Sequence, residues 1–272
     1  MSVDLCRSDR GRGSPTVVLL HYYAGSSRAW DAVVAELDAS HRCVAADLRG
    51  FGDSEAPPSG YAVRDYADDV VALLAAVRAE RFVLVGHSMG GKIAMAVAAR
   101  RPPGLDALVL VAPSPPTPEP MPEATRAHLL ATYGDHAAAA QTARDITVRP
   151  LAPPAFDQVV RDSLRTSARA WNAWLLEGSR EDISAEMPRV VVPTLVVVGG
   201  ADPVMHRPML EREVRDRIAG ARLRAVPGVG HLVPLEAPAE LAALIREGAG
   251  AAGGAEPAPH HATRPPADVE HP

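Results

Sequence analysis

The segment FVLVGHSMGGKIAMAVAAR, residues 82–100, decides the fold. It begins with a short apolar run, turns through GHSMG at residues 86–90, and continues with apolar residues at helical spacing. A serine on a tight turn between a strand and a helix must adopt a strained backbone, and the glycines two positions away on either side remove side chains that would clash there. The amides of the following helix favour negative charge beside the serine. The pattern therefore predicts a strand, an exposed nucleophilic hydroxyl on Ser88, and a helix.

The same alternation of strand and helix recurs along the chain. Short apolar runs rich in β-branched residues are each followed by a Gly or Asp turn and then by a stretch with helical spacing, which is typical of parallel sheets. Most runs are apolar throughout, as expected for strands covered on both faces. We expect an α/β fold with a doubly wound, mostly parallel sheet. The predicted strands are 16–21, 42–46, 82–85, 107–111 and 194–198, and the predicted helices are 28–37, 64–77, 89–100 and 209–219.

A proline-rich segment interrupts this alternation. No apolar strand is evident between residues 114 and 193, and dense proline at the start of this stretch disfavours both helix and inner strand. The patterns at 123–133, 137–147 and 157–177 are helical, so we expect an inserted helical cap over the edge of the sheet. The predicted division is an α/β core at 1–113 and 186–246, a cap at 114–185, and a disordered tail at 247–272, whose composition cannot repay the entropy of ordering.

The turn at residues 86–90, in this setting of strand and helix, resembles that of the α/β-hydrolase superfamily. The resemblance covers about residues 14–246 and favours the branch of small cap-bearing serine esterases, carbon–carbon bond hydrolases and cofactor-free haloperoxidase-like enzymes. It implies the α/β-hydrolase fold and a nucleophile, acid and base that follow one another along the chain in that order.

A serine hydroxyl is a weak nucleophile at neutral pH, so Ser88 needs a base to take its proton and an acid to orient that base. The glycine-rich stretch that ends at His231 matches the loop that carries the base in the resembled family. Asp202 follows the run 194–198 and lies beyond the carboxyl end of a predicted strand, where parallel sheets build their sites. An acid after the run 107–111, as in some relatives, is rejected because residues 112–114 read Ala-Pro-Ser. Non-catalytic interpretations of both residues stay open: Asp202 could be only a turn residue, and His231 only a capping or solvent-facing histidine.

Two backbone amides should stabilise the oxyanion of the tetrahedral intermediate. Met89 supplies one by its position after the serine. The stretch HYYAGS, residues 21–26, resembles the family's His-Gly-x-x-Gly-Ser loop, which places Tyr23 at the other donor position. Tyr22 is a departure, because the family usually has glycine there. His21 is interpreted as a structural anchor of the loop, and the stretch 47–54 as a structural tie between loops.

Candidate substrate contacts are Tyr22, His87, Trp171 and Trp174. The two tryptophans lie three residues apart, which would put a large apolar surface on one face of a cap helix. A stripe of this kind also serves simply to dock a cap onto the core, and that alternative stays open.

Composition limits the classes of partner. The 272 residues carry a formal net charge of −5 and no dense basic run, so we expect no nucleic-acid partner. No apolar stretch is long enough to span a bilayer, and residues 1–13 lack the apolar segment of a secretory signal, so we expect a cytoplasmic protein without a membrane partner. Neither a metal-ligand spacing nor a dinucleotide fingerprint is evident, and Cys6 and Cys43 have no neighbouring ligands in the sequence, so no metal or cofactor is predicted. The expected partner is a small-molecule substrate, and the oligomeric state stays open.

The resulting prediction is a serine hydrolase that cleaves a small to medium, mostly apolar carboxylic ester or lactone through an acyl-enzyme. Three alternatives stay open. The same triad could act on a carbon–carbon bond or form peracids in the haloperoxidase manner, a dry pocket could make the chain an acyltransferase or cyclase, or the fold could serve as a non-catalytic ligand receptor.

Overall fold

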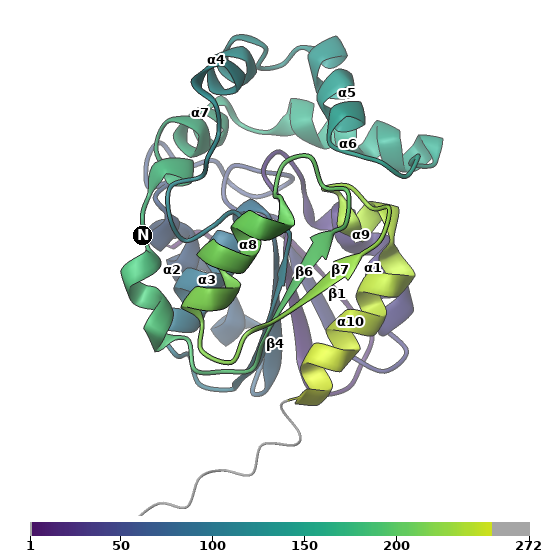
Figure 1. Ribbon diagram of the computed structural model, residues 1–272. Coiled ribbons are helices and arrows are strands. Elements are labelled where there is room, and N and C mark those ends of the chain that lie inside the picture. Colours follow the sequence, from purple (N-terminus) through teal and green to yellow (C-terminus); the bar gives the residue numbers. More distant parts are fainter. Residues whose placement is uncertain (1, 252–272) are drawn as a thin grey trace, which may run out of the picture.

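The computed structural model describes residues 2–251, and within them a seven-stranded sheet in the order β1-β3-β2-β4-β5-β6-β7 forms the centre of the molecule (Figure 1). Strand β1 is antiparallel to β3, and all other neighbours are parallel, so the predicted mostly parallel sheet is confirmed. The strands are β1 Arg7–Arg10, β2 Thr16–Leu20, β3 Cys43–Ala46, β4 Phe82–His87, β5 Leu105–Val111, β6 Thr194–Gly199 and β7 Arg222–Val226.

Helices cover both faces of the sheet, so the prediction of a doubly wound fold is confirmed as well (Figure 1). Successive strand residues alternate between two hydrophobic cores, as the two-residue period of a strand requires. Val18 and Leu20 of β2 belong to the core under α2 Val63–Ala76, α3 Met89–Ala99 and α8 Arg207–Glu213. Val17 and Leu19 belong to the core under α1 Asp31–Leu37 and α10 Pro238–Ala251.

The two strands at the ends of the sheet were not predicted. Most residues of β1 (RSDR) and of β7 (RLRAV) are exposed or half-buried, so neither strand has the continuous apolar run of a buried parallel strand. Helix α10 was not predicted either, and it continues to Ala251, five residues past the expected end of the core at 246. The remaining part of the predicted disordered tail, 252–272, lies outside the described residues.

Four helices between β5 and β6 form a cap above the carboxyl ends of the parallel strands (Figure 1). They are α4 Glu123–Ala131, α5 His136–Asp145, α6 Pro153–Arg165 and α7 Ala168–Leu176. The prediction of one continuous helix at 157–177 is wrong, because the chain breaks between α6 and α7. Thr166 is extended, the Ser167 amide donates to the Gly50 carbonyl at 2.9 Å, and the Ser167 hydroxyl caps α7 by accepting from the Ala170 amide.

Within residues 2–251, no helix combines the length and the apolar character that crossing a bilayer requires. Cys6 is exposed and Cys43 is buried, and neither forms a disulfide.

Candidate active site

Ser88 lies on a strained turn between β4 and α3. Its backbone has φ 51° and ψ −115°, a conformation that residues with a side chain rarely adopt. The neighbouring glycines permit it: a Cβ on Gly86 would lie 2.3 Å from the Gly90 carbonyl oxygen, and a Cβ on Gly90 would lie 2.5 Å from the His21 carbonyl oxygen. The Ser88 amide donates to the Val111 carbonyl at 3.0 Å, which ties the turn to β5. The strain predicted from the sequence is therefore present at this position.

Three predicted side chains meet at the carboxyl edge of the sheet. Ser88 Oγ lies 3.0 Å from His231 Nε2, and His231 Nδ1 lies 2.9 Å from Asp202 Oδ2. Asp202 follows β6 and His231 follows β7, so residues more than 140 positions apart in sequence form one hydrogen-bonded chain. All three side chains are largely buried. Because the Asp202 carboxylate only accepts, His231 carries its proton on Nδ1 and presents Nε2 as an acceptor to the Ser88 hydroxyl.

The surroundings of Asp202 keep it ionised. Burial alone would raise its pKa, but the His231 ring and the amides of Met205 and Val204 more than compensate, so the pKa of Asp202 lies below its usual value. Both amides donate to Oδ1, at 2.7 Å from Val204 and 2.9 Å from Met205. This leaves Oδ2 facing His231 in a fixed direction.

Glu236 holds the loop that carries His231, and sequence reasoning did not find it. Its carboxylate accepts from the Gly230 amide at 2.8 Å and from the Leu232 amide at 3.1 Å, on either side of the histidine. It also accepts from the amides of Val148 and Arg149, which follow α5 of the cap. The only signal in the sequence is an acidic residue shortly after His231.

The two predicted oxyanion donors have free amides. In the described part of the chain, neither the Tyr23 amide nor the Met89 amide donates to a protein acceptor. The Tyr23 side chain points into the cap, where its hydroxyl donates to the Trp171 carbonyl at 3.1 Å and the two rings lie 5.1 Å apart. A tetrahedral oxyanion beside Ser88 could accept from such donors.

The unusual Tyr22 is accommodated by the residues around it. Its ring lies over Gly25, where an added Cβ would come within 2.6 Å of the ring. The ring is otherwise enclosed by Ala143 and Val159 of the cap and by the His87 ring at 5.2 Å. His21 acts as the expected anchor: its Nδ1 donates to the Tyr22 carbonyl at 2.7 Å and its Nε2 accepts from the Leu48 amide at 3.0 Å.

A cavity of about 640 Å³ between the core and the cap opens onto Ser88 and His231. Of the predicted substrate contacts, Tyr22, Trp171 and Trp174 line it, and Tyr23 does so as well. Much of the rest of the wall is apolar, with Met121, Leu129, Val159 and Met209 among the lining residues.

His87 does not belong to the cavity wall, contrary to the prediction. It is fully buried beneath His231, and its Nε2 donates to the His231 carbonyl at 2.8 Å. Burial holds the pKa of His87 well below the ordinary value for histidine, so the ring is neutral. A strand residue one position before Ser88 points into the opposite face, which explains why it supports the base instead of contacting a ligand.

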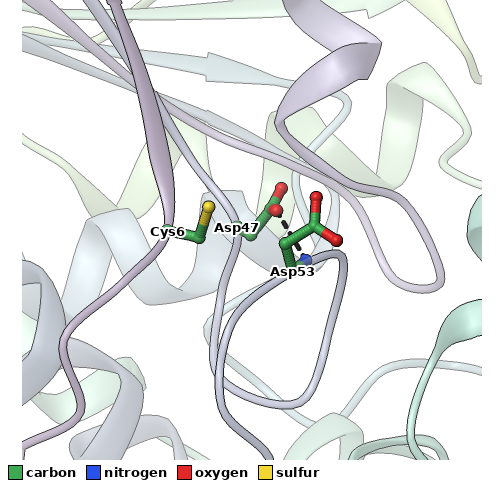
Figure 2. Close-up of side chains that lie close together, drawn as sticks. All are labelled: Cys6, Asp47 and Asp53. Atoms are coloured by element: carbon green, nitrogen blue, oxygen red, sulfur yellow. Dashed lines mark hydrogen bonds between the residues drawn. The ribbon is translucent and has the colours of Figure 1, made fainter.

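One group of side chains has metal-ligand character and was not predicted. Figure 2 shows the Cys6 thiol near the carboxylates of Asp47 and Asp53. The potential ligand atoms of these three residues all lie within 4.8 Å of one another. The Asp47 oxygens already accept from the amides of Ser27 and Asp53, at 2.6 Å and 2.8 Å. The Asp53 carboxylate pairs with two arginines. These contacts hold neighbouring loops together, which is the structural role predicted for the stretch 47–54.

Comparisons with known proteins agree with this fold. Residues 17–244 match the model of the alpha/beta hydrolase family. A Synechocystis protein named "Putative non-heme chloroperoxidase" is 27% identical over 264 residues, which cover 85% of this chain and 90% of that protein. The enol-lactonase of Burkholderia xenovorans is 25% identical with a TM-score of 0.80, over 90% of this chain and 96% of its own. The thermophilic esterase of Thermogutta terrifontis is 25% identical with a TM-score of 0.72, over 90% and 92%.

Proposed function

The chain belongs to the alpha/beta hydrolase family, and within it we propose a serine hydrolase that cleaves a small to medium, mostly apolar carboxylic ester or lactone. The observation that carries the proposal is the hydrogen-bonded chain from Ser88 through His231 to Asp202, which opens on a cavity with largely apolar walls. The similarity to an enol-lactonase and to an esterase supports the same class of substrate.

In the proposed reaction, Ser88 Oγ attacks the carbonyl carbon while His231 Nε2 takes the hydroxyl proton. Asp202 keeps its bond to Nδ1 and stabilises the imidazolium that forms. The amides of Tyr23 and Met89 donate to the oxyanion. His231 then gives the proton to the leaving alcohol, which departs and leaves an acyl group on Ser88. A water molecule that loses its proton to His231 attacks this acyl-enzyme, and the acid leaves with Ser88 restored.

The test is hydrolysis of p-nitrophenyl esters graded by acyl length, with Ser88→Ala and, as a matched control, Ser59→Ala at an exposed loop position. Loss of the attacking oxygen should lower kcat by about 10⁴-fold or more. The control should keep the parent rate. Turnover by Ser88→Ala at the parent rate would contradict the assignment, and a wild-type serine that does not react with a fluorophosphonate would favour a ligand receptor.

Peracid formation is a second candidate, favoured by the similarity to the named chloroperoxidase. Hydrogen peroxide in place of water would attack the acyl-enzyme, and a peracid would leave with Ser88 restored. Bromide oxidation that depends on both peroxide and a carboxylic acid, and that is lost in Ser88→Ala, would identify this activity. Transfer of the acyl group to an added alcohol in preference to water would identify an acyltransferase.

A further inference from the structure

The segment after β5 contacts the nucleophile before it leaves the core. The Ser114 amide donates to the Ser88 carbonyl at 2.9 Å. Glu119 follows five positions later, between two prolines, and its amide donates to the Ser179 carbonyl at 2.7 Å. Glu119 lines the same cavity as Ser88. Residues 112–114, directly after this strand, contain no acid, and Glu119 is a more distant carboxylate in the same segment.

The Glu119 carboxyl is only half satisfied by the protein. Its Oε2 accepts from the Ser114 hydroxyl at 2.8 Å, and no donor among residues 2–251 reaches Oε1. The nearby Lys92 ammonium donates instead to the carbonyls of Thr117 and Glu181. Burial raises the pKa of Glu119, although the Ser114 hydrogen bond and the Lys92 charge act in the opposite direction. Glu119 is half-buried, so an open carboxylate oxygen at the cavity wall gains a hydrogen bond when a donor binds there.

A second glutamate in the same molecule shows what a purely structural carboxylate looks like here. Both oxygens of Glu236 accept from backbone amides, with Oε2 taking those of Val148, Arg149 and Gly230 and Oε1 taking that of Leu232. Glu119 has one donor and one open oxygen at a cavity wall. The difference indicates a group whose second partner comes from a bound molecule.

We propose that Glu119 Oε1 is a polar subsite that accepts a hydrogen bond from a hydroxyl or a protonated amine of the substrate. The inference rests on the proposed function and narrows its substrate from plain apolar esters to esters or lactones that carry such a donor. Met121, two positions further along the chain, lines the same cavity with an apolar side chain, and Leu129 and Trp174 also belong to its wall. A site built to hydrogen-bond a substrate donor discriminates strongly against the analogue that lacks it.

The experiment compares matched p-nitrophenyl esters whose acyl chain ends in a methyl, a hydroxyl or an ammonium group, at several chain lengths. A parallel series varies the alcohol side of butyrate esters in the same way. The proteins are the wild type, Glu119→Gln, Glu119→Met and the control Glu123→Gln. Glu123 is exposed on α4, pairs with Arg180 and Arg126 and does not line the cavity, so the control removes the same charge nearby.

At one chain length or more, the wild type and the control should prefer a donor-bearing ester by about tenfold to a hundredfold in kcat/KM. Glu119→Gln should lose most of an ammonium preference and keep part of a hydroxyl preference, and Glu119→Met should lose both while it still hydrolyses the methyl series. A hydroxyl preference identifies an alcohol and an ammonium preference identifies an amine.

Equal rates for all three endings in the wild type would overturn the inference, as would a preference that survives in Glu119→Met. If Glu119→Met does not fold, Glu119→Gln decides, because it keeps the shape of the side chain and an acceptor for Ser114. In both of these overturning outcomes the wild type still hydrolyses the methyl series, so the proposed function stands. No turnover of any ester by the wild type would instead overturn the proposed function, and this inference with it.

Discussion

The Asp202→Asn substitution has an effect that follows from the hydrogen bonds of Asp202. The Oδ1 atom accepts from the amides of Val204 and Met205, and an asparagine can satisfy both amides only with its carbonyl oxygen. Its NH₂ group must then face His231 Nδ1, where the carboxylate oxygen lies at 2.9 Å in the wild type. The histidine would have to accept on Nδ1 and carry its proton on Nε2. The ring could no longer take the Ser88 proton.

The expected loss is about 10³- to 10⁴-fold in kcat, or about 4–5.5 kcal/mol at about 1.4 kcal/mol per tenfold change. KM should change little, because Asp202 does not line the cavity. Steady-state hydrolysis of a p-nitrophenyl ester measures both parameters, and circular dichroism checks that the variant is folded.

Asp216→Asn is the matched control, because its carboxylate is exposed and, among residues 2–251, is bonded only to Arg215. It should retain the parent kcat. The claim that this variant moves the His231 proton to Nε2 is refuted if the kcat of Asp202→Asn stays within tenfold of the parent value. It is also refuted if the variant raises KM while kcat is unchanged.

Three further predictions concern stability. Burial lowers the pKa of Lys92 to about 8 from 10.5, so the unfolded chain binds more protons than the folded protein between these pH values. The free energy of unfolding, measured relative to Lys92→Met, should therefore rise by about 3 kcal/mol from pH 8 to 10.5. Urea titrations in which the difference between the two proteins does not change with pH would contradict this. Asp162→Ala removes the acceptor that lies 2.7 Å from the buried Ser26 hydroxyl and should lower the free energy of unfolding by about 2 kcal/mol. Asp162→Asn keeps an acceptor and should lower it less. Equal losses of stability in thermal unfolding would argue against this hydrogen bond. Gly86→Ala places a Cβ 2.3 Å from the Gly90 carbonyl oxygen and should cost about 2–3 kcal/mol; an unchanged urea midpoint would show that the turn relaxes freely.

The parts of the fold that the sequence predicted are those in which burial and periodicity agree. The inner strands are buried at nearly every position, as in β2 (Thr16–Leu20) and β6 (Thr194–Gly199), so their apolar runs are visible without coordinates. The outer strands β1 and β7 follow no such pattern because solvent covers much of their surface. The break between α6 and α7 depends on a contact with Gly50, more than 100 positions away, which no local pattern contains.

The candidate site divides in the same way. Ser88, Asp202 and His231 could be predicted because each follows a strand in a recognisable loop. Glu119 and Glu236 could not be predicted, because no local sequence pattern shows that Glu119 lines the cavity. Nor does any pattern show that Glu236 accepts from amides of both the His231 loop and the segment after α5. His87 was assigned to the cavity from its place next to Ser88, but the strand's alternation turns its ring to the other face.

The most direct test of the account is peptide mass spectrometry after brief exposure to a slowly hydrolysed ester or a fluorophosphonate. The account predicts a covalent adduct on Ser88 in the wild type, a much slower reaction in His231→Ala, and none at this position in Ser88→Ala. Ester turnover without an adduct on Ser88, or an adduct that forms at the same rate without His231, would contradict it.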